Sequence, residues 1–230
     1  MIEAVVFDLD GVLLDSEHVW DGVREELARE RGGRWHPRAQ AEMMGMSSTE
    51  WSRYMHEVIG LREPPAEINA EIVRRMQARY AEHLPLIDGA VGAVERLARS
   101  FRLALASSSN RPLIDLVLAQ ADLGAVFEVT VSSEEVARGK PAPDVFLEAA
   151  RRLGVAADRC AAIEDSGNGI RAARAAGMRV IAIPNRHYQP PAHVLALADV
   201  VLQSIAELTA QRVSGVDEPP GPPSSSPRRA

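Results

Sequence analysis

Short runs of apolar residues alternate with segments of helical periodicity along most of the chain. This alternation is typical of a parallel sheet that is covered by helices on both faces. We predict six strands, at residues 3–8, 101–106, 127–131, 159–164, 178–183 and 199–202. The pattern therefore predicts an α/β fold with a doubly wound parallel sheet.

Helical patterns fill the gaps between these runs. Residues 90–99, 143–154 and 169–177 carry apolar side chains at helical spacing. The second segment ends at Gly154 and the third at Gly177, and glycine is the residue that most often ends a helix. These segments are the predicted crossover helices of the sheet.

The strand signal disappears between Asp15 and Leu86, where the chain reads as helices only. A segment of this length is too long for a loop, so we predict a helical insert after the first strand. The predicted domains are a core at residues 1–15 and 88–212 and a helical cap at 16–87. Residues 213–230 are rich in Pro, Gly and Ser, which predicts a disordered tail.

Three local patterns in the insert and at its start predict structural roles. The run "SSTE" at residues 47–50 fits a capping box, and Met43, Met44 and Met46 are expected to pack rather than to bind a ligand. Asp15 and Glu17 are interpreted as a capping pair for the first helix of the insert, without a catalytic role.

The composition narrows the class of protein. A chain of 230 residues with 46% hydrophobic content can bury a substantial core. No apolar stretch is long enough to span a bilayer, and Met1 leads directly into an apolar run without a signal sequence, so we expect a cytoplasmic protein. The net charge of −6 and the lack of a basic stripe argue against nucleic-acid binding. Cys160 is the only cysteine, which excludes an internal disulfide and favours a buried position in a strand.

Of the 26 basic residues, all but Lys140 are arginines. A chain that uses arginine almost everywhere is expected to keep a lysine where a compact charge on a flexible stem is needed. A chance position on the surface is the alternative.

The first strand ends in "DLDG", with Asp8 and Asp10 directly after a run of core residues. Burying one carboxylate without a partner is costly, and a second carboxylate adds repulsion. We therefore expect a positive group beside this pair.

Polar groups also follow the other predicted strands. The second strand ends in "SSSN" from Ser107, the fourth ends in Glu164 and Asp165, and Lys140 lies in the loop after the third. Because functional groups collect at the carboxyl ends of parallel strands, these side chains are expected to converge on one site.

These motifs and their order strongly resemble the haloacid dehalogenase superfamily of phosphotransferases. The resemblance covers residues 1 to about 205 and rests on "DLDGVLLDSE", the hydroxyl after "LALA", "GKPAPD" and "IEDSGNGIRAARAAG". The helical insert is similar to the cap of the branch that includes beta-phosphoglucomutase and sugar-phosphate phosphatases. The resemblance implies a phosphorylated small molecule as substrate and a protein that acts as a monomer or a weak homo-oligomer.

The resemblance also implies roles for the candidate residues. Asp8 would attack phosphorus to form an aspartyl-phosphate, and Asp10 would act as the general acid and base. The expected positive group is Mg²⁺, held by the Asp8 carboxylate, the Asp10 backbone carbonyl, Glu164 and Asp165.

Three further residues would bind the phosphate. By resemblance, Lys140 would hold a phosphate oxygen together with Asp8 and cancel charge in the transition state. Ser107 would donate its hydroxyl and Ser108 its backbone N–H, next to a helix that starts near Asn110. Helix capping is the alternative role of this serine run.

Two positions of the cap differ from beta-phosphoglucomutases and favour hydrolysis over isomerisation. Trp20 stands where those enzymes carry a histidine, and Ser48 where they carry an arginine for a second phosphate. We therefore predict a Mg²⁺-dependent phosphatase that acts on small phosphorylated metabolites, with sugar phosphates as the expected class. His18 is either a substrate contact or structural. Packing or a surface position is expected for most of Trp20, Trp35, Trp51 and the cap arginines, including Arg53, and a role in shaping the substrate pocket is the alternative.

Three alternatives remain open from the sequence. A phosphomutase of the beta-phosphoglucomutase type would use the same Asp8 and Asp10. A 2-haloacid dehalogenase would use Asp8 on carbon and needs neither a metal nor an acid at Asp10. A signalling receiver domain also combines a phospho-accepting aspartate, a metal, a hydroxyl and a lysine on a doubly wound sheet.

Overall fold

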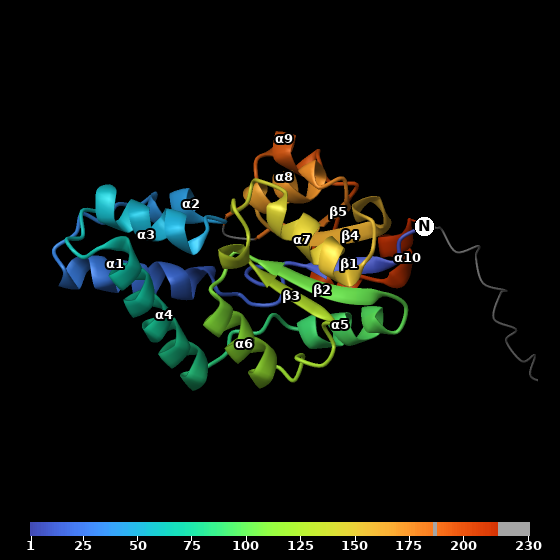
Figure 1. Ribbon diagram of the computed structural model, residues 1–230, viewed down its shortest axis with the longest axis horizontal. Coiled ribbons are helices and arrows are strands. Elements are labelled where there is room, and N and C mark those ends of the chain that lie inside the picture. The colour runs from blue at the N-terminus through green and yellow to red at the C-terminus, as the bar shows by residue number, and fades with distance from the viewer. Residues whose placement is uncertain (186–187, 216–230) are drawn as a thin grey trace, which may run out of the picture.

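The computed structural model describes residues 1–185 and 188–215. Within these residues the core is one parallel sheet with the strand order β3-β2-β1-β4-β5-β6. Figure 1 labels β1 to β5 of this sheet. The strands are β1 (Ala4–Phe7), β2 (Arg102–Ser107), β3 (Val129–Ser132), β4 (Cys160–Glu164), β5 (Arg179–Ala182) and β6 (Val200–Val201). All six predicted strands and the predicted fold class are confirmed.

Strand β1 occupies the centre of the sheet because both of its faces are apolar. Val5 and Phe7 pack into one hydrophobic cluster, whereas Ala4 and Val6 pack into the cluster on the opposite face. A strand that is buried on both faces reads as a continuous apolar run, which is the pattern of this segment. The order of the sheet reverses at β1, and the crevice at such a point is where ligands bind in folds of this kind.

Helices cover both faces of the sheet. One face packs against α5 (Ala90–Ala98) and α6 (Arg111–Gln120), and the other against α7 (Asp144–Leu153) and α8 (Gly167–Ala175). The shorter helices α9 (Ala192–Leu195) and α10 (Ala210–Ser214) follow near the end of the described chain. The predicted end of α7 is confirmed, since Gly154 adopts a left-handed conformation with φ of 69°. Cys160 is buried in β4, as expected.

The segment between β1 and α5 forms four helices, which lie to one side of the sheet in Figure 1. They are α1 (Glu17–Glu30), α2 (Ala39–Met43), α3 (Ser48–Glu57) and α4 (Pro65–Glu82). We call these helices and their connections the cap. The predicted capping box at the start of α3 is confirmed: the Ser47 N–H lies 2.8 Å and its hydroxyl 2.6 Å from a Glu50 carboxylate oxygen. The predicted domain boundaries at 15/16 and 87/88 stay a prediction.

The two chain segments that join the cap to the core run side by side. The Asp15 N–H donates to the Pro85 carbonyl at 2.8 Å, and the Ile87 N–H donates to the Leu13 carbonyl at 2.9 Å. Between these two hydrogen bonds, Leu14 and Leu86 form an isolated antiparallel β-bridge. This pairing places the base of the cap directly beyond β1, next to the aspartate pair.

The folded chain extends further than the sequence analysis indicated. Val213 is fully buried in α10, so the predicted disordered tail does not begin at residue 213. A single apolar residue in a polar surrounding gave too weak a pattern to predict this short helix. Residues 216–230 of the predicted tail lie outside the described residues. Within the part of the chain that is described, no helix is long and apolar enough to cross a membrane.

Candidate active site

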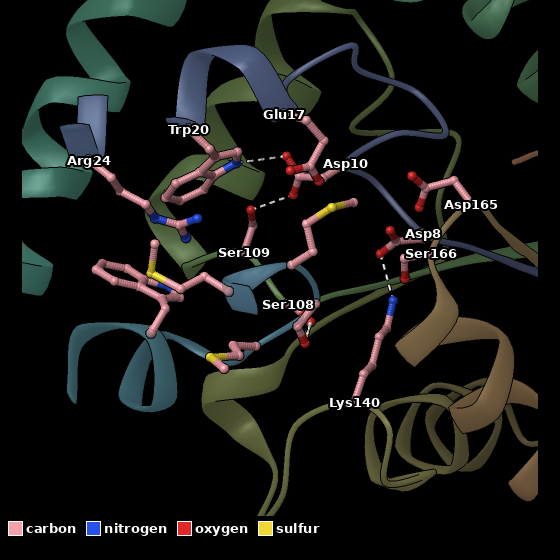
Figure 2. Close-up of a pocket in the computed structure, with 15 residues that line it drawn as sticks. Asp8, Asp10, Glu17, Trp20, Arg24, Ser108, Ser109, Lys140, Asp165 and Ser166 are labelled. Carbon is pink, nitrogen blue, oxygen red and sulfur yellow. Dashed lines mark hydrogen bonds and ion pairs between the residues drawn. The ribbon is translucent and has the colours of Figure 1, made fainter. Parts of the chain in front are cut away.

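A cavity of about 50 Å³ lies at the carboxyl ends of the central strands, between the core and the cap. Asp8, Lys140 and Asp165 line it from the core, and residues of α1 line it from the cap, as Figure 2 shows. The structure thus brings together side chains from β1, from the loop after β3 and from the end of β4. This is the convergence expected for the ends of neighbouring parallel strands.

Lys140 connects two carboxylates at the bottom of the site. Its Nζ lies 2.7 Å from Asp8 Oδ1 and 2.6 Å from Glu164 Oε1, and the residue is only 2% exposed. Burial alone would lower the pKa of Lys140, but the charges of Asp8 and Glu164 outweigh burial and raise the pKa above its ordinary value. The single lysine of the chain is therefore a buried ammonium inside the acidic cluster and not a surface residue.

The acidic cluster has more negative charge than this lysine compensates. Asp8, Glu164 and Asp165 each offer a carboxylate oxygen within 4.8 Å of the others. Burial, opposed by Lys140 and reinforced by Glu164, raises the pKa of Asp8 to about 8. Burial together with the charges of Glu164 and Asp8 also raises the pKa of Asp165 well above its usual range. Deprotonated carboxylates at this position need a further cation.

The unsatisfied oxygen of this cluster belongs to Asp165. Its Oδ2 is buried without a hydrogen-bond partner, and Gly11 leaves open the space beside it, because a Cβ at Gly11 would lie 1.9 Å from this oxygen. Glu164 differs, since its Oε2 accepts from the N–H groups of Asp165 and Ser166. Carboxylate oxygens crowded in this way are the ligands that hard divalent cations prefer, so the cluster fits a metal ion.

Asp10 is held by three hydrogen-bond donors. The Ser16 hydroxyl lies 2.5 Å and the Trp20 indole N–H 3.1 Å from Oδ1, while the Ser109 hydroxyl lies 2.6 Å from Oδ2. Trp20 belongs to the cap and Ser109 to the loop after β2, as Figure 2 shows. The carboxylate of Asp10 thus connects the cap to the core.

The side chains of the serine run after β2 hydrogen-bond to other protein groups in this structure. Ser107 is fully buried and its hydroxyl oxygen accepts from the Ser109 N–H at 3.0 Å. Ser108 lines the cavity, and its hydroxyl donates to the Gly45 carbonyl of the cap. The phosphate-binding roles of Ser107 and Ser108 stay predictions. Ser109, which touches Asp10, was not singled out by the sequence analysis, although it lies in the quoted motif.

The capping interpretation of Glu17 is wrong. Its carboxylate faces the cavity and accepts from the Gln40 side chain at 2.7 Å. Burial, followed by the charge of Asp10, raises the pKa of Glu17 to about 7. A polar partner on α2 turns this side chain inward, away from the helix end that it would otherwise cap.

Arg24 is a cap arginine that the sequence analysis did not name individually. It is 4% exposed and its guanidinium carbon lies 4.6 Å from the centre of the Trp20 ring and 4.9 Å from that of Trp51. Burial lowers the pKa of Arg24 to about 10, against the charges of Glu17 and Asp10. A signal was present, because residues 17, 20 and 24 share one face of a helix.

The remaining cap candidates lie as follows. His18 is exposed, and neither it nor Arg53 is among the residues that line the cavity. The Ser48 hydroxyl donates to Glu134 at 3.0 Å. The cavity wall includes Trp51 and the three methionines Met43, Met44 and Met46.

Comparison with known proteins agrees with this arrangement. The family model for haloacid dehalogenase-like hydrolases matches residues 2–177. Hexitol phosphatase B of Escherichia coli (strain K12) is 34% identical, over 93% of this chain and 97% of the relative. Fructose-1-phosphate phosphatase YqaB of the same strain is 32% identical, over 77% of this chain and 94% of the relative.

Solved structures show the same fold. A mutant of CbbY from Rhodobacter sphaeroides, in complex with xylulose-(1,5)-bisphosphate, has a TM-score of 0.78 and 31% sequence identity. The alignment covers 90% of this chain and 96% of CbbY. With the family match, the relatives and the strand order in agreement, the chain belongs to the haloacid dehalogenase-like hydrolases.

Proposed function

We propose that this protein is a Mg²⁺-dependent phosphatase that hydrolyses small phosphorylated metabolites, sugar phosphates in particular, through an aspartyl-phosphate on Asp8. The observation that carries the proposal is the buried Lys140–Asp8 pair beside the unpartnered Asp165 oxygen. A nucleophilic carboxylate, a fixed cation and free ligand oxygens within one cavity are what phosphoryl transfer to an aspartate requires.

Mg²⁺ would be held by the carboxylates of Asp8, Asp165 and Glu164 and by the backbone carbonyl of Asp10. When bound, it would neutralise the charge that opposes the approach of a carboxylate to a phosphate group. Glu164 already serves Lys140 and two backbone N–H groups, so Asp165 is the ligand that the hydrogen bonding favours most.

In the first half of the reaction, a carboxylate oxygen of Asp8 bonds to phosphorus while the bond from phosphorus to the leaving oxygen breaks. Asp10 gives a proton to that oxygen, so the leaving group departs as an alcohol. Lys140 remains beside Asp8 and offsets the charge on the transferring phosphoryl group.

In the second half, a water molecule attacks phosphorus and the bond from phosphorus to Asp8 breaks. Asp10 takes a proton from this water, which releases inorganic phosphate and restores both aspartates. Asp10 is suited to this exchange because Ser109 and Trp20 fix both of its oxygens within reach of the cavity.

The substrate class follows from the relatives. Two phosphatases with 34% and 32% identity are named for a hexitol phosphate and for fructose 1-phosphate. The positions of Trp20 and Ser48, which bond to Asp10 and to Glu134, support hydrolysis over a mutase reaction. The cytoplasmic location and the monomeric or weakly associated state stay predictions from the sequence.

The test is phosphate release with Mg²⁺ and with EDTA, across hexose, hexitol, pentose, glycolate and nucleotide monophosphates. We expect release that requires the metal and that is lost in Asp8→Asn. Asp115→Asn, an exposed change of the same type on α6, is the matched control and should retain full activity.

Three results would overturn the proposal. Faster isomerisation of a hexose 1-phosphate than phosphate release would identify a mutase. Chloride release from a 2-haloacid in the presence of EDTA would identify a dehalogenase. A stable phosphate on Asp8 without turnover would identify a phospho-accepting domain.

A further inference from the structure

The cap side of the cavity carries a polar cluster for which the proposed chemistry has no use. Arg24 Nη1 donates to Gln40 Oε1 at 3.0 Å, and Gln40 Nε2 donates to Glu17 Oε2 at 2.7 Å. Both Arg24 and Gln40 are nearly fully buried, at 4% and 3% exposure. Buried polar groups of this kind are costly unless they are paired or meet a ligand.

The pairing within this cluster is incomplete. The Nε of Arg24 is buried without a hydrogen-bond partner. Trp20 and Trp51 lie against the guanidinium and hold it in place. Figure 2 shows Arg24 and Glu17 on the cap side of the cavity, across from Asp8 and Lys140.

The charge of the cavity limits what can bind there. Its described lining contains four carboxylates and two cations, and one of the cations, Lys140, is occupied by Asp8 and Glu164. The other cation, Arg24, donates a hydrogen bond to Gln40, and Gln40 in turn donates one to the carboxylate of Glu17. A bound divalent cation would bring the lining close to neutral, which leaves no positive charge for a second phosphate or a carboxylate on the substrate.

We infer that Arg24, Gln40 and Glu17 form a hydroxyl-binding subsite that selects phosphomonoesters with an uncharged, polyhydroxylated leaving group. Hydroxyl groups are both donors and acceptors, so they match a cluster that offers a carboxylate, an amide and guanidinium N–H groups. Glu17 repels a second anionic group at the same position. This inference rests on the proposed phosphatase function and assigns its specificity to three cap residues.

The test measures kcat/KM for two pairs of substrates. The first pair is sorbitol 6-phosphate and p-nitrophenyl phosphate, which lacks hydroxyl groups. The second pair is xylulose 5-phosphate and xylulose-1,5-bisphosphate, which differ by one phosphate. We expect the wild type to prefer the monophosphate of the second pair by at least tenfold. In Glu17→Gln, the ratio of kcat/KM for sorbitol 6-phosphate to that for p-nitrophenyl phosphate should fall about tenfold, because a neutral acceptor binds hydroxyl groups more weakly than a charged one. The same variant should discriminate less against the bisphosphate.

Glu25→Gln is the matched control, since Glu25 lies on α1 and pairs with the exposed Arg29. It should leave every ratio unchanged. Because Arg24→Gln could disturb the packing of the cap, Gln40→Leu serves as the second variant, with the same fall in the sorbitol 6-phosphate ratio expected.

The outcomes separate the two proposals. No metal-dependent release from any substrate would overturn the phosphatase function itself. An active wild type that prefers the bisphosphate, or variants that lose activity on sorbitol 6-phosphate and p-nitrophenyl phosphate equally, would overturn the hydroxyl-binding subsite alone.

Discussion

Gly11 lies directly after Asp10, where the chain leaves β1 and turns towards the cap. Its φ of +81° is in the left-handed region, which a residue with a Cβ adopts only with strain. The absence of a side chain also leaves room for Asp165, because a Cβ at residue 11 would lie 1.9 Å from Asp165 Oδ2. One glycine thus permits both the turn and the close approach of Asp165, the carboxylate that we propose as a metal ligand.

We expect Gly11→Ala to reduce kcat/KM by more than 100-fold and to weaken activation by Mg²⁺, because Asp165 must move away from the cluster. The backbone strain should also lower the free energy of unfolding by roughly 1–3 kcal/mol. Mg²⁺ titration of activity and urea denaturation measure the two effects.

Gly92→Ala is the matched control for this change. Gly92 lies in α5 with open space around its Cα, so alanine should stabilise the helix by about 0.5–1 kcal/mol without altering activity. If Gly11→Ala keeps the wild-type response to Mg²⁺, the proposed role of Gly11 is wrong.

At the scale of elements, the connection between α2 and α3 is where the cap rests on the core. The Asn168 side chain at the start of α8 donates to the Met44 carbonyl at 3.0 Å, and Ser108 donates to the Gly45 carbonyl. These bonds close a cavity of about 50 Å³, whereas pockets that enclose a small-molecule ligand measure roughly 300–1,000 Å³. We therefore expect the cap to move away from the core before a sugar phosphate enters.

We expect Asn168→Ala to raise KM by about 2- to 10-fold without lowering kcat. The variant loses one hydrogen bond that favours the closed cap, a contribution of about 0.5–1.5 kcal/mol, while the reacting groups stay in place. Steady-state kinetics on the best substrate measure the effect.

Ser214→Ala provides the comparison, because this hydroxyl bonds only within α10 among the contacts described, far from the cap in the chain. It should leave KM unchanged. A fall in kcat with a constant KM for Asn168→Ala would contradict a role in closing the cap.

At the scale of the whole molecule, folding buries carboxyl groups of the site close to one another. This burial costs free energy when they are charged, and the rest of the fold must offset that cost. The pKa of Asp8 is raised to about 8 and that of Glu17 to about 7. Between the ordinary carboxyl range and these values, the folded protein binds more protons than the unfolded chain. Stability without metal must then decrease as the pH rises through this window.

We expect the free energy of unfolding in EDTA to fall between pH 5.5 and pH 8.5, by up to about 1.4 kcal/mol per pH unit for each proton involved. Mg²⁺ should reduce this slope, because it binds the deprotonated carboxylates. Urea denaturation at four pH values, with and without Mg²⁺, measures both.

Asp8→Asn should reduce the slope in EDTA, since the pKa of Asp8 is raised further than that of Glu17. A stability in EDTA that is constant or increases over this range would show that the cluster is not strained by charge.

Local pattern was enough to predict the sheet and the core of the site. The strands are continuous apolar runs; Asp8 and Asp165 follow two of them directly, and Lys140 lies in the loop after a third. Because parallel strands align their carboxyl ends, chain order alone placed these residues together. The short helix around Val213 was not predictable in this way, because its burial depends on a surface formed by distant segments.

The sequence by itself determined the strands, the family motifs and the choice of the single lysine as a candidate site residue, since these depend on position and spacing along the chain. Only the tertiary structure decided that Glu17, Arg24 and Gln40 meet, because α1 and α2 must first pack against each other. It also decided that Ser109 and Trp20 both hold Asp10, which joins a loop of the core to a helix of the cap. Contacts between separate elements depend on how helices pack, and a linear pattern does not encode that geometry.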